Sequence, residues 1–494
     1  MNAALVVIGI FFFIALAAGV FAGRGVNMNL SEWAVANRRF GAAITFVLIA
    51  GEVFSTYSFL GATGWAYAVG APTFYYLGCA SLAFVVGYWT LPRLWQIAQS
   101  RGLISFSDFF ESRYESRALG LVVAVIALLA MIPLLVIQLK GLGIIVQEGS
   151  YGSISEHTAV WVGVSLMVLY IVVSGIRGAA TVAIIKDVSI FCLALFLAIY
   201  LPLHYFGGYS AMFGAIVQQK PTHFELPAKG FNLSWYNSTI ILVTLGYYLY
   251  PYTFTSIYAA KSADAVRKNT IALPLYQMLI TCMYLVGFSA ITVIPGLTGP
   301  AADLALFRIA KLTFDPWFVG VIGGVGLLTA VVPGAMILLN ASTLIAKSLL
   351  ERWLLPRPDG RLTTVAARIS VPIYALIAVY ALLASGIEMV PLALLASNLL
   401  CQLCPAFLLG IFRRDPLSPR AAMAGIASGL AVLGIVLIGF NGSLAAAIPW
   451  APDFLQSCNL GFVALCVNAA VHLGLVFMPR WAMIESPRWL RRGT

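Results

Sequence analysis

Long apolar stretches recur along almost the whole chain, and they constrain its fold more than any other feature. A helix of about 20 apolar residues spans the hydrocarbon core of a membrane. Thirteen stretches approach or exceed this length, at residues 3–22, 41–68, 72–97, 118–147, 157–176, 181–204, 236–258, 270–296, 317–349, 367–386, 388–411, 420–440 and 459–478. Of the 494 residues, 61% are hydrophobic and 10% are charged, whereas soluble domains have about 25% charged residues. The sequence therefore predicts an all-α polytopic membrane protein with about 13 transmembrane helices.

These stretches divide the chain into three parts. Residues 1–30 hold the first helix and its loop, residues 31–415 form the expected core, and residues 416–494 add two helices and a short cytoplasmic tail. The first stretch lacks the basic leader and the cleavage motif of a signal peptide, so we expect it to remain as a spanning helix. The tail is too short for a signalling domain.

Basic residues gather on one side when the loops are assigned alternately to the two sides of the membrane. That side receives 23 of the 29 Lys and Arg residues, and the other side receives Lys220, Lys229, Arg308 and Lys311. Cytoplasmic loops carry the basic excess in membrane proteins. We therefore expect the N-terminus outside and the C-terminus in the cytoplasm, in a plasma membrane such as the bacterial inner membrane. The net charge of +11 follows from this topology and implies no nucleic-acid partner.

The motifs of ATP-driven and metal-dependent enzymes are absent from the sequence. It contains no G-x-x-x-x-G-K-[ST] phosphate loop and no H-E-x-x-H, and its four His residues are scattered. The seven Cys residues lie in or beside apolar stretches, as small packing residues do. We therefore expect a protein that is not an enzyme, with the lipid bilayer and a small-molecule solute as partners. No cofactor is expected, apart from Na⁺ or H⁺ as a coupling ion.

Two stretches contain residues that interrupt a helix at the depth of the bilayer. In the second stretch, Gly51, Gly61 and Gly64 surround a carboxylate and a cluster of hydroxyl groups, and in the seventh stretch Pro251 follows Gly246. Unwound backbone at this depth is tolerated where it lines a cavity or binds a ligand. If helices 2–6 and 7–11 are two repeats, each break lies in the first helix of its repeat. Because each repeat has five helices, an odd number, the two repeats would have inverted topology. The matched breaks favour a transporter site, although packing glycines and a simple kink explain either break alone equally well.

Four charged residues lie inside the predicted helices, away from the helix ends, namely Glu52, Lys140, Lys186 and Asp187. Each costs roughly 2.5–3.5 kcal/mol at the centre of a membrane helix, so we expect each to be paired, neutralised or in contact with water. Lys186 and Asp187 point about 100° apart on a helix, so we expect them to find partners elsewhere rather than neutralise each other. Lys140 can reach the interface from its helix. The two carboxylates are too short to do so, and a functional role is expected for them.

Several of these segments together resemble the signature of the sodium:solute symporter family. They are residues 55–67, Gln138 with Leu139, the turn at 175–178 leading to Asp187, and residues 246–251 followed by 258–262. The resemblance extends from about residue 30 to residue 420. It implies a leucine-transporter-type fold with two inverted five-helix repeats, broken first helices and additional helices at the ends. It also implies transport by alternating access, in most members driven by a sodium gradient.

The resemblance places a sodium site at the first break, but this sequence departs from the pattern. The implied backbone ligands lie near Gly51, Phe54, and Pro333 or Gly334. Two hydroxyl residues should complete the site, and Ile337 and Leu338 stand in their positions. Because sodium needs about five or six oxygen ligands, we expect the site to be degenerate. A bulge that brings in Ser342 and Thr343 is the alternative.

Two hypotheses for coupling follow from this departure. In the first, a proton replaces sodium and is carried by Glu52 or Asp187, because a carboxyl group in an apolar cavity holds a proton more readily than in water. In the second, Lys186 supplies a fixed positive charge near the vacant site and makes transport independent of sodium. Sodium binding at the carbonyls of Gly51 and Phe54 remains a third alternative.

The residues expected to bind the solute lie at the two breaks and on the fourth helix, and are Glu52, Ser55, Thr56, Tyr57, Gln138, Lys140, Tyr247 and Tyr248. Helix dipoles at the breaks favour a small carboxylate, and Lys140 offers a positive charge. We expect the import of a monocarboxylate or an amino-acid-like compound rather than a sugar, which needs more hydrogen-bonding groups. The tyrosines are equally compatible with ordinary packing.

Other functions remain open at this stage. They include a sodium-coupled symporter of a sugar or vitamin, and a solute sensor on a transporter scaffold. A channel would need continuous pore-lining helices in place of the breaks. The sequence does not indicate an oligomeric state.

Overall fold

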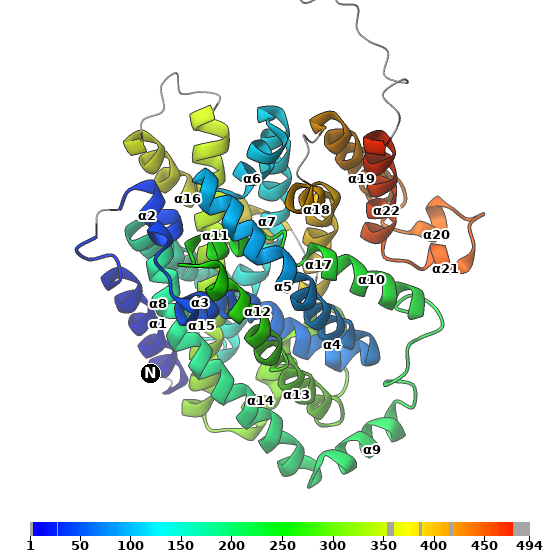
Figure 1. Cartoon of the computed structure of the whole chain (residues 1–494). Helices are drawn as coiled ribbons and strands as arrows, with labels where there is room; N and C mark the ends of the chain where they lie inside the picture. The colour runs from blue at the N-terminus through cyan, green and yellow to red at the C-terminus, as the bar shows by residue number, and fades with distance from the viewer. Residues whose placement is uncertain (1–2, 27, 353–359, 385–387, 414–417, 478–494) are drawn as a thin grey trace, which may run out of the picture.

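The computed structural model describes residues 3–26, 28–352, 360–384, 388–413 and 418–477, which form an all-helical bundle (Figure 1). The long helices and the helices joined end to end within one crossing are α1 (Ala3–Phe21), α5 (Tyr75–Arg101), α7 (Arg117–Gly149), α8 (Glu156–Phe206), α12 (Ala263–Gln277), α13 (Ile280–Val293), α15 (Pro316–Leu344), α16 (Gly360–Ala384), α17 (Met389–Leu400), α18 (Cys404–Phe412), α19 (Pro419–Gly439) and α22 (Leu460–Phe477). Two further helices are broken, α3 (Ala42–Val53) continuing into η2 (Tyr57–Gly61) and α4 (Ala62–Val69), and α10 (Leu233–Gly246) continuing into α11 (Pro251–Ala259). The short connecting helices are α2 (Leu30–Val35), η1 (Ala36–Arg38), η3 (Ala71–Phe74), α6 (Phe106–Tyr114), α9 (Tyr209–Gln219), η4 (Gly299–Leu304), α14 (Ala305–Thr313), η5 (Ile345–Glu351), η6 (Cys401–Leu403), α20 (Leu444–Ala447) and α21 (Asp453–Gln456).

The number of crossings agrees with the sequence pattern. Among the described residues, ten helical segments are long and apolar enough to cross a membrane, and the two broken pairs raise the number to 12. The 51 residues of α8 would extend about 76 Å, more than twice a hydrocarbon core of about 30 Å. Because α8 is interrupted at Gly175 and is long enough for two crossings, the number of candidate spans is close to the 13 predicted helices. The predicted all-α polytopic fold is confirmed.

The interruption of α8 depends on a glycine. Gly175 has a φ of +55° and a ψ of −142°, a backbone conformation that is essentially restricted to glycine. A Cβ atom at this position would also overlap the backbone oxygen of Trp33 on α2. The indole of Trp33 is buried and donates a hydrogen bond to the carbonyl oxygen of Ile171 at 2.9 Å. The two halves of α8 are therefore oriented by a close backbone contact with α2.

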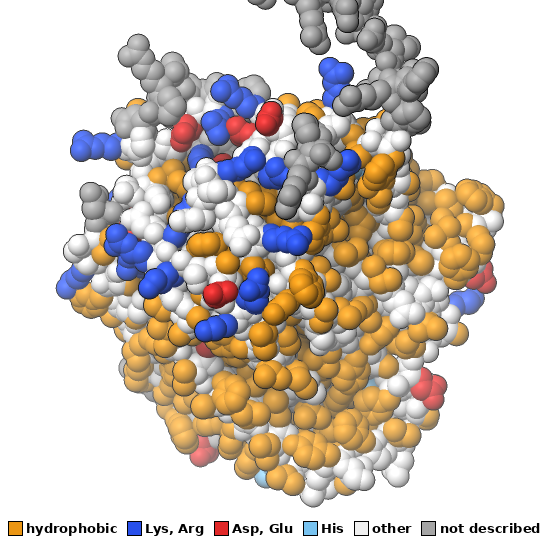
Figure 2. Space-filling view, viewed as in Figure 1, with side chains coloured by type: hydrophobic (Ala, Val, Ile, Leu, Met, Phe, Trp, Pro, Cys, Tyr) orange, Lys and Arg blue, Asp and Glu red, His pale blue; other side chains and the backbone are white. Residues whose placement is uncertain are grey.

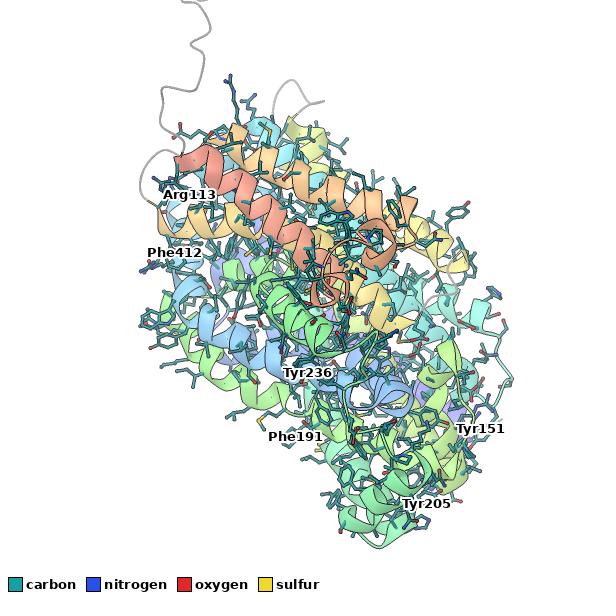
Figure 3. The ribbon with its side chains drawn as sticks, turned by 90° about the vertical axis from the view of Figure 1, so that its right-hand side faces the viewer. Arg113, Tyr151, Phe191, Tyr205, Tyr236 and Phe412 are labelled. Atoms are coloured by element: carbon teal, nitrogen blue, oxygen red, sulfur yellow. The ribbon has the colours of Figure 1, made fainter. Side chains whose placement is uncertain are left out.

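Charge and hydrophobic surface separate along the bundle. On the face in Figure 2, most Lys and Arg side chains lie in the upper part, and hydrophobic side chains cover most of the middle and lower parts. Figure 3 places Arg113 and Phe412 at one end of the bundle and Tyr151 and Tyr205 at the other. The loop assignment puts the first two residues on the basic side and the last two on the opposite side. For these four residues, the two ends of the bundle correspond to the two sides of the loop assignment.

The core of the bundle is built around α15. Almost all of its residues are buried, and it packs against α1, α7 and α8. At the end of α11, the backbone of Phe40 pairs with that of Ala260, so that the segment before α3 is joined to the end of the second broken helix. Figure 1 shows α11 nearer the middle of the molecule and α10 at its right-hand side, and residues at both breaks, such as Phe54 and Tyr248, are buried. The two breaks consequently lie deep in the protein.

Candidate functional site

The first break leaves backbone carbonyls without helical partners at the end of α3. The helix ends at Val53, Phe54 has a φ of −89° and a ψ of 87°, and the chain then bends by 53° into a π-helical turn. The last carbonyls of any helix have no N–H donor within that helix. Gly51 allows α3 to approach α8 closely, because a Cβ atom there would lie 3.0 Å from the Cβ of Ala183. The break therefore presents free carbonyl oxygens to α8.

The second break follows from a proline. The helix α10 ends at Gly246, Tyr250 is extended, and Pro251 occupies the first position of α11, with a bend of 40° between the helices. A proline is favoured at this position because its missing N–H has no helical acceptor to lose. The N-terminal end of α11 therefore faces the interior of the protein.

A cavity lies between the two breaks. The volume of this cavity is about 80 Å³, enough to hold more than one water molecule. Its lining is contributed by α3, the first break, α5, α7, α10, the second break, α11, α15 and α17. The lining residues are Glu52, Val53, Ser55, Tyr57, Tyr75, Tyr76, Leu134, Ile137, Gln138, Val243, Tyr247, Tyr250, Tyr252, Thr253, Pro333, Ile337, Ala393, Leu394 and Ser397.

The structure brings five of the eight expected solute-binding residues to this cavity, namely Glu52, Ser55, Tyr57, Gln138 and Tyr247. The Thr56 hydroxyl donates to Gln138 Oε1 at 2.9 Å, so it lies behind this wall and holds the amide in place. Tyr248 points away, because its hydroxyl accepts a hydrogen bond from the backbone N–H of Gly87 at 3.0 Å.

The expected role of Lys140 is not supported by its position. Its ammonium group contacts Asp303 Oδ2 of η4 at 2.8 Å. It lines a separate hollow together with Glu156 and His157. Lys140 therefore joins α7 to η4 and lies outside the lining of the central cavity.

Six polar lining residues lie outside the predicted set of solute-binding residues, namely Tyr75, Tyr76, Tyr250, Tyr252, Thr253 and Ser397. The hydroxyls of Tyr57 and Tyr75 lie 2.8 Å apart, and the rings of Tyr57 and Tyr76 lie 5.3 Å apart. The adjacent pair of tyrosines at the start of α5 was a signal in the sequence. Its connection to the breaks depends on the packing of α5 against α10.

Glu52 carries the free carboxylate of the cavity. Its side chain is 4% exposed, and Oε1 accepts a hydrogen bond from the Ser256 hydroxyl of α11 at 2.5 Å. The other oxygen, Oε2, is buried and has no hydrogen-bond partner among the described residues. An unpaired charge at this depth is costly, so this oxygen is a candidate for a proton or for a group of the solute.

Lys186 lies at the position expected for sodium. Its side chain is completely buried on α8. The ammonium nitrogen donates to the carbonyl oxygen of Gly51 at 3.0 Å and to that of Phe54 at 2.7 Å. It also contacts Asp187 Oδ1 at 2.8 Å. Because an ammonium group has three donors, these three acceptors satisfy it completely.

The expectation that Lys186 and Asp187 do not neutralise each other is wrong. Their Cα–Cβ directions do diverge on α8, but the four methylene groups of the lysine allow Nζ to fold back to the neighbouring carboxylate. The same reach brings Nζ to the carbonyls of α3. Asp187 Oδ1 also accepts a hydrogen bond from the Tyr276 hydroxyl of α12 at 3.0 Å, and its Oδ2 lacks a partner among the described residues.

The two positions at which hydroxyl groups should complete the implied sodium site hold Ile337 and Leu338, which have no side-chain oxygen. Pro333 and Ile337 line the cavity, Gly334 faces Met167 of α8, and Leu338 is buried. The alternative pair does not reach the site either, since the hydroxyls of Ser342 and Thr343 donate to the carbonyl oxygen of Leu339 in their own helix. With an ammonium group on two of the carbonyls, these residues do not fit a sodium ion.

Comparisons with known proteins agree with this architecture. The model of the family described as "Sodium:solute symporter family" matches residues 33–441. A Bacillus subtilis protein described as the uncharacterized symporter YhjB is 41% identical, with 98% of each chain covered. A monocarboxylate transport permease protein of Rhizobium johnstonii is 25% identical, with 95% of this chain and 96% of the relative covered. The solved structure of a Na⁺-coupled sialic acid symporter superposes with a TM-score of 0.78 at 15% identity, covering 97% of this chain and 98% of the other.

Proposed function

The chain belongs to the sodium:solute symporter family, and we propose that it imports a small monocarboxylate or amino-acid-like solute without binding sodium. A symporter function follows from the family. The solute class and the coupling ion are the proposal. The observation that supports the coupling is the ammonium group of Lys186 on the carbonyls of Gly51 and Phe54.

Lys186 acts in this proposal as a cation that is part of the chain. In its protonated form it links α8 to the broken end of α3 and balances Asp187. Loss of the proton removes the positive charge from the two carbonyls and weakens the link between α3 and α8. Alternating access requires such elements to move relative to each other. The Lys186–Asp187 pair therefore takes up a proton on the outer side and releases it on the inner side, in place of a sodium ion.

The properties of the cavity support a small carboxylate-bearing solute. Its volume of about 80 Å³ suits a small solute. Tyr252 and Thr253 line it from the first turn of α11, where the helix dipole favours a negative group. A relative that is 25% identical over nearly its whole length is described as a monocarboxylate transport permease. The lining has fewer amide and carboxylate groups than a sugar requires.

Ion dependence is tested with purified protein in proteoliposomes that contain a pH-sensitive dye. L-Lactate, L-alanine and L-proline are added outside, with a pH gradient or a sodium gradient as the only driving force. We expect the lumen to acidify faster than in protein-free liposomes for at least one solute. The rate should be equal in sodium and potassium buffers, and a sodium gradient alone should drive no uptake of the radiolabelled solute.

Two outcomes would contradict the proposal. Uptake that requires sodium would show that Lys186 does not replace the ion. Absence of solute-dependent proton entry, with solute uptake retained, would show that the Lys186–Asp187 pair does not carry a proton.

A further inference from the structure

We propose that the solute carries a protonated amine and that the carboxylate of Glu52, a residue of the cavity lining, binds this amine. This inference rests on the proposed function, because it defines the solute of the same cavity. Among the described residues that line the cavity, Glu52 is the only charged one. A cavity with one carboxylate and no cation of its own is suited to a positively charged group.

The local charges support this assignment. The nearest buried cation, Lys186, is already paired with Asp187 at 2.8 Å and bound to two carbonyls. Lys140 is paired with Asp303 outside the cavity lining. For Glu52 the structure gives a single hydrogen bond, from the uncharged Ser256, and no ion pair among the described residues. A carboxyl group in this setting is ionised when a cation balances it, and a protonated amine of the solute is such a cation.

The position of Glu52 on its helix increases the demand for a cation. It is the penultimate residue of α3, which ends at Val53. The C-terminal end of a helix carries a partial negative charge that repels a carboxylate and attracts cations. Lys186 meets part of this demand from the α8 side, at the carbonyls. A solute amine would meet the rest from the cavity side, at the carboxylate.

The aromatic lining is also suited to an amine. Six tyrosines line the cavity, namely Tyr57, Tyr75, Tyr76, Tyr247, Tyr250 and Tyr252. Several of their hydroxyls are engaged by protein groups, for example that of Tyr250 by the Ser397 hydroxyl at 2.8 Å. The rings of Tyr250 and Tyr252 are stacked with centroids 5.4 Å apart. Aromatic faces attract an ammonium group that is partly removed from water.

A simple monocarboxylate fits this arrangement less well. Its negative charge would enter a small cavity that already holds the Glu52 carboxylate, and like charges at short distance repel strongly where the dielectric constant is low. An amino acid has both charges. Its carboxylate can lie near the first turn of α11 and its amine at the carboxylate of Glu52. The proposed class is therefore a small amino acid or a related amine.

The test compares solutes that differ only in the amine. Thermal unfolding of the purified full-length protein is measured with three pairs: L-alanine and propionate, L-proline and cyclopentanecarboxylate, and 4-aminobutyrate and butyrate. A ligand that binds the folded state raises the unfolding temperature. We expect at least one amine to stabilise the protein, with an apparent affinity at least tenfold higher than that of its amine-free partner.

Two substitutions of Glu52 connect this preference to the carboxylate. Glu52→Gln removes the charge and nearly keeps the shape, and it should weaken amine binding at least tenfold. Glu52→Asp retains the charge and should retain part of the binding. Asp264→Asn removes one charge from an exposed carboxylate that pairs with Arg267, and it should leave amine binding unchanged.

The outcomes separate this inference from the proposed function. Stabilisation by the amine-free carboxylates and not by their amine-bearing partners would overturn the amine assignment. It would leave the proposal of a sodium-independent symporter intact. Absence of stabilisation by any amine, or full amine binding by Glu52→Gln, would also overturn it. If Glu52→Gln does not fold, the comparison of each amine with its amine-free partner on the unmodified protein still tests whether the solute carries an amine. Sodium dependence is measured in the separate liposome experiment.

Discussion

Replacing Lys186 with methionine is expected to abolish proton-driven uptake and to lower the free energy of unfolding by about 3–5 kcal/mol, the usual cost of removing one partner of a buried ion pair. Methionine nearly preserves the length of the side chain but removes all three donors. The carbonyls of Gly51 and Phe54 and the carboxylate of Asp187 would then be buried without their common partner. Thermal unfolding in detergent and dye acidification in liposomes measure the two effects.

A double variant distinguishes the structural part of this effect from the transport part. Lys186→Met with Asp187→Asn removes the unbalanced carboxylate and should recover part of the lost stability, whereas proton-driven uptake should remain absent. Lys268→Met removes a charge from an exposed lysine and should behave like the unmodified protein in both assays. Normal pH-driven uptake by Lys186→Met would contradict the role proposed for the lysine.

Replacing Gly175 with alanine is expected to destabilise the protein by about 3 kcal/mol or more. Backbone strain for a non-glycine residue in this conformation accounts for about 1–3 kcal/mol. The overlap of the new Cβ with the backbone oxygen of Trp33 adds to this, because neither backbone can move without separating α2 from α8. The measurement is the shift of the thermal unfolding temperature, together with the yield of folded protein.

A glycine without neighbours serves as the control for this substitution. Gly434 lies inside α19, and a Cβ atom there would meet no atom within 4 Å. Gly434→Ala should therefore leave stability unchanged or raise it by up to about 1 kcal/mol, the difference in helix propensity between the two residues. Equal effects of the two substitutions would show that the contact between Gly175 and Trp33 does not orient the halves of α8.

The sequence predicted the architecture because membrane crossings depend on local composition. A break predicted from Gly51 and its neighbours occurs at the end of α3, and one predicted from Pro251 occurs at the start of α11. Apolar windows do not report short helices that lie across the ends of the bundle, and so α2, α6, α9 and α14 were not predicted. The stretch at 388–411 was predicted as one helix, whereas the turn η6 divides it into α17 and α18.

The residues of the candidate site that lie at the two breaks were predictable from the sequence. The residues that reach the site through the packing of distant helices were not. Glu52 and Tyr57 are neighbours of the first break in the sequence. Tyr75 and Tyr76 reach the cavity because α5 packs beside α10, a contact between segments about 160 residues apart. The pairing of Lys186 with Asp187 depends on the path of a flexible side chain. Helix periodicity gives the direction of the first bond of such a chain and not the position of its end.

A cation that is covalently attached to the protein cannot dissociate into the medium, so no gradient of that cation can drive transport. A sodium symporter can convert the sodium gradient into a solute gradient because its cation dissociates on each side with a separate equilibrium. With Lys186 in that position, only the proton on the nitrogen can exchange, and the work available per cycle comes from the proton and from the charge of the solute. At a stoichiometry of one proton and without a membrane potential, one pH unit supports at most a tenfold accumulation, or about 1.4 kcal/mol. The largest accumulation ratio that the protein can maintain should therefore follow external pH and remain constant over any range of external sodium.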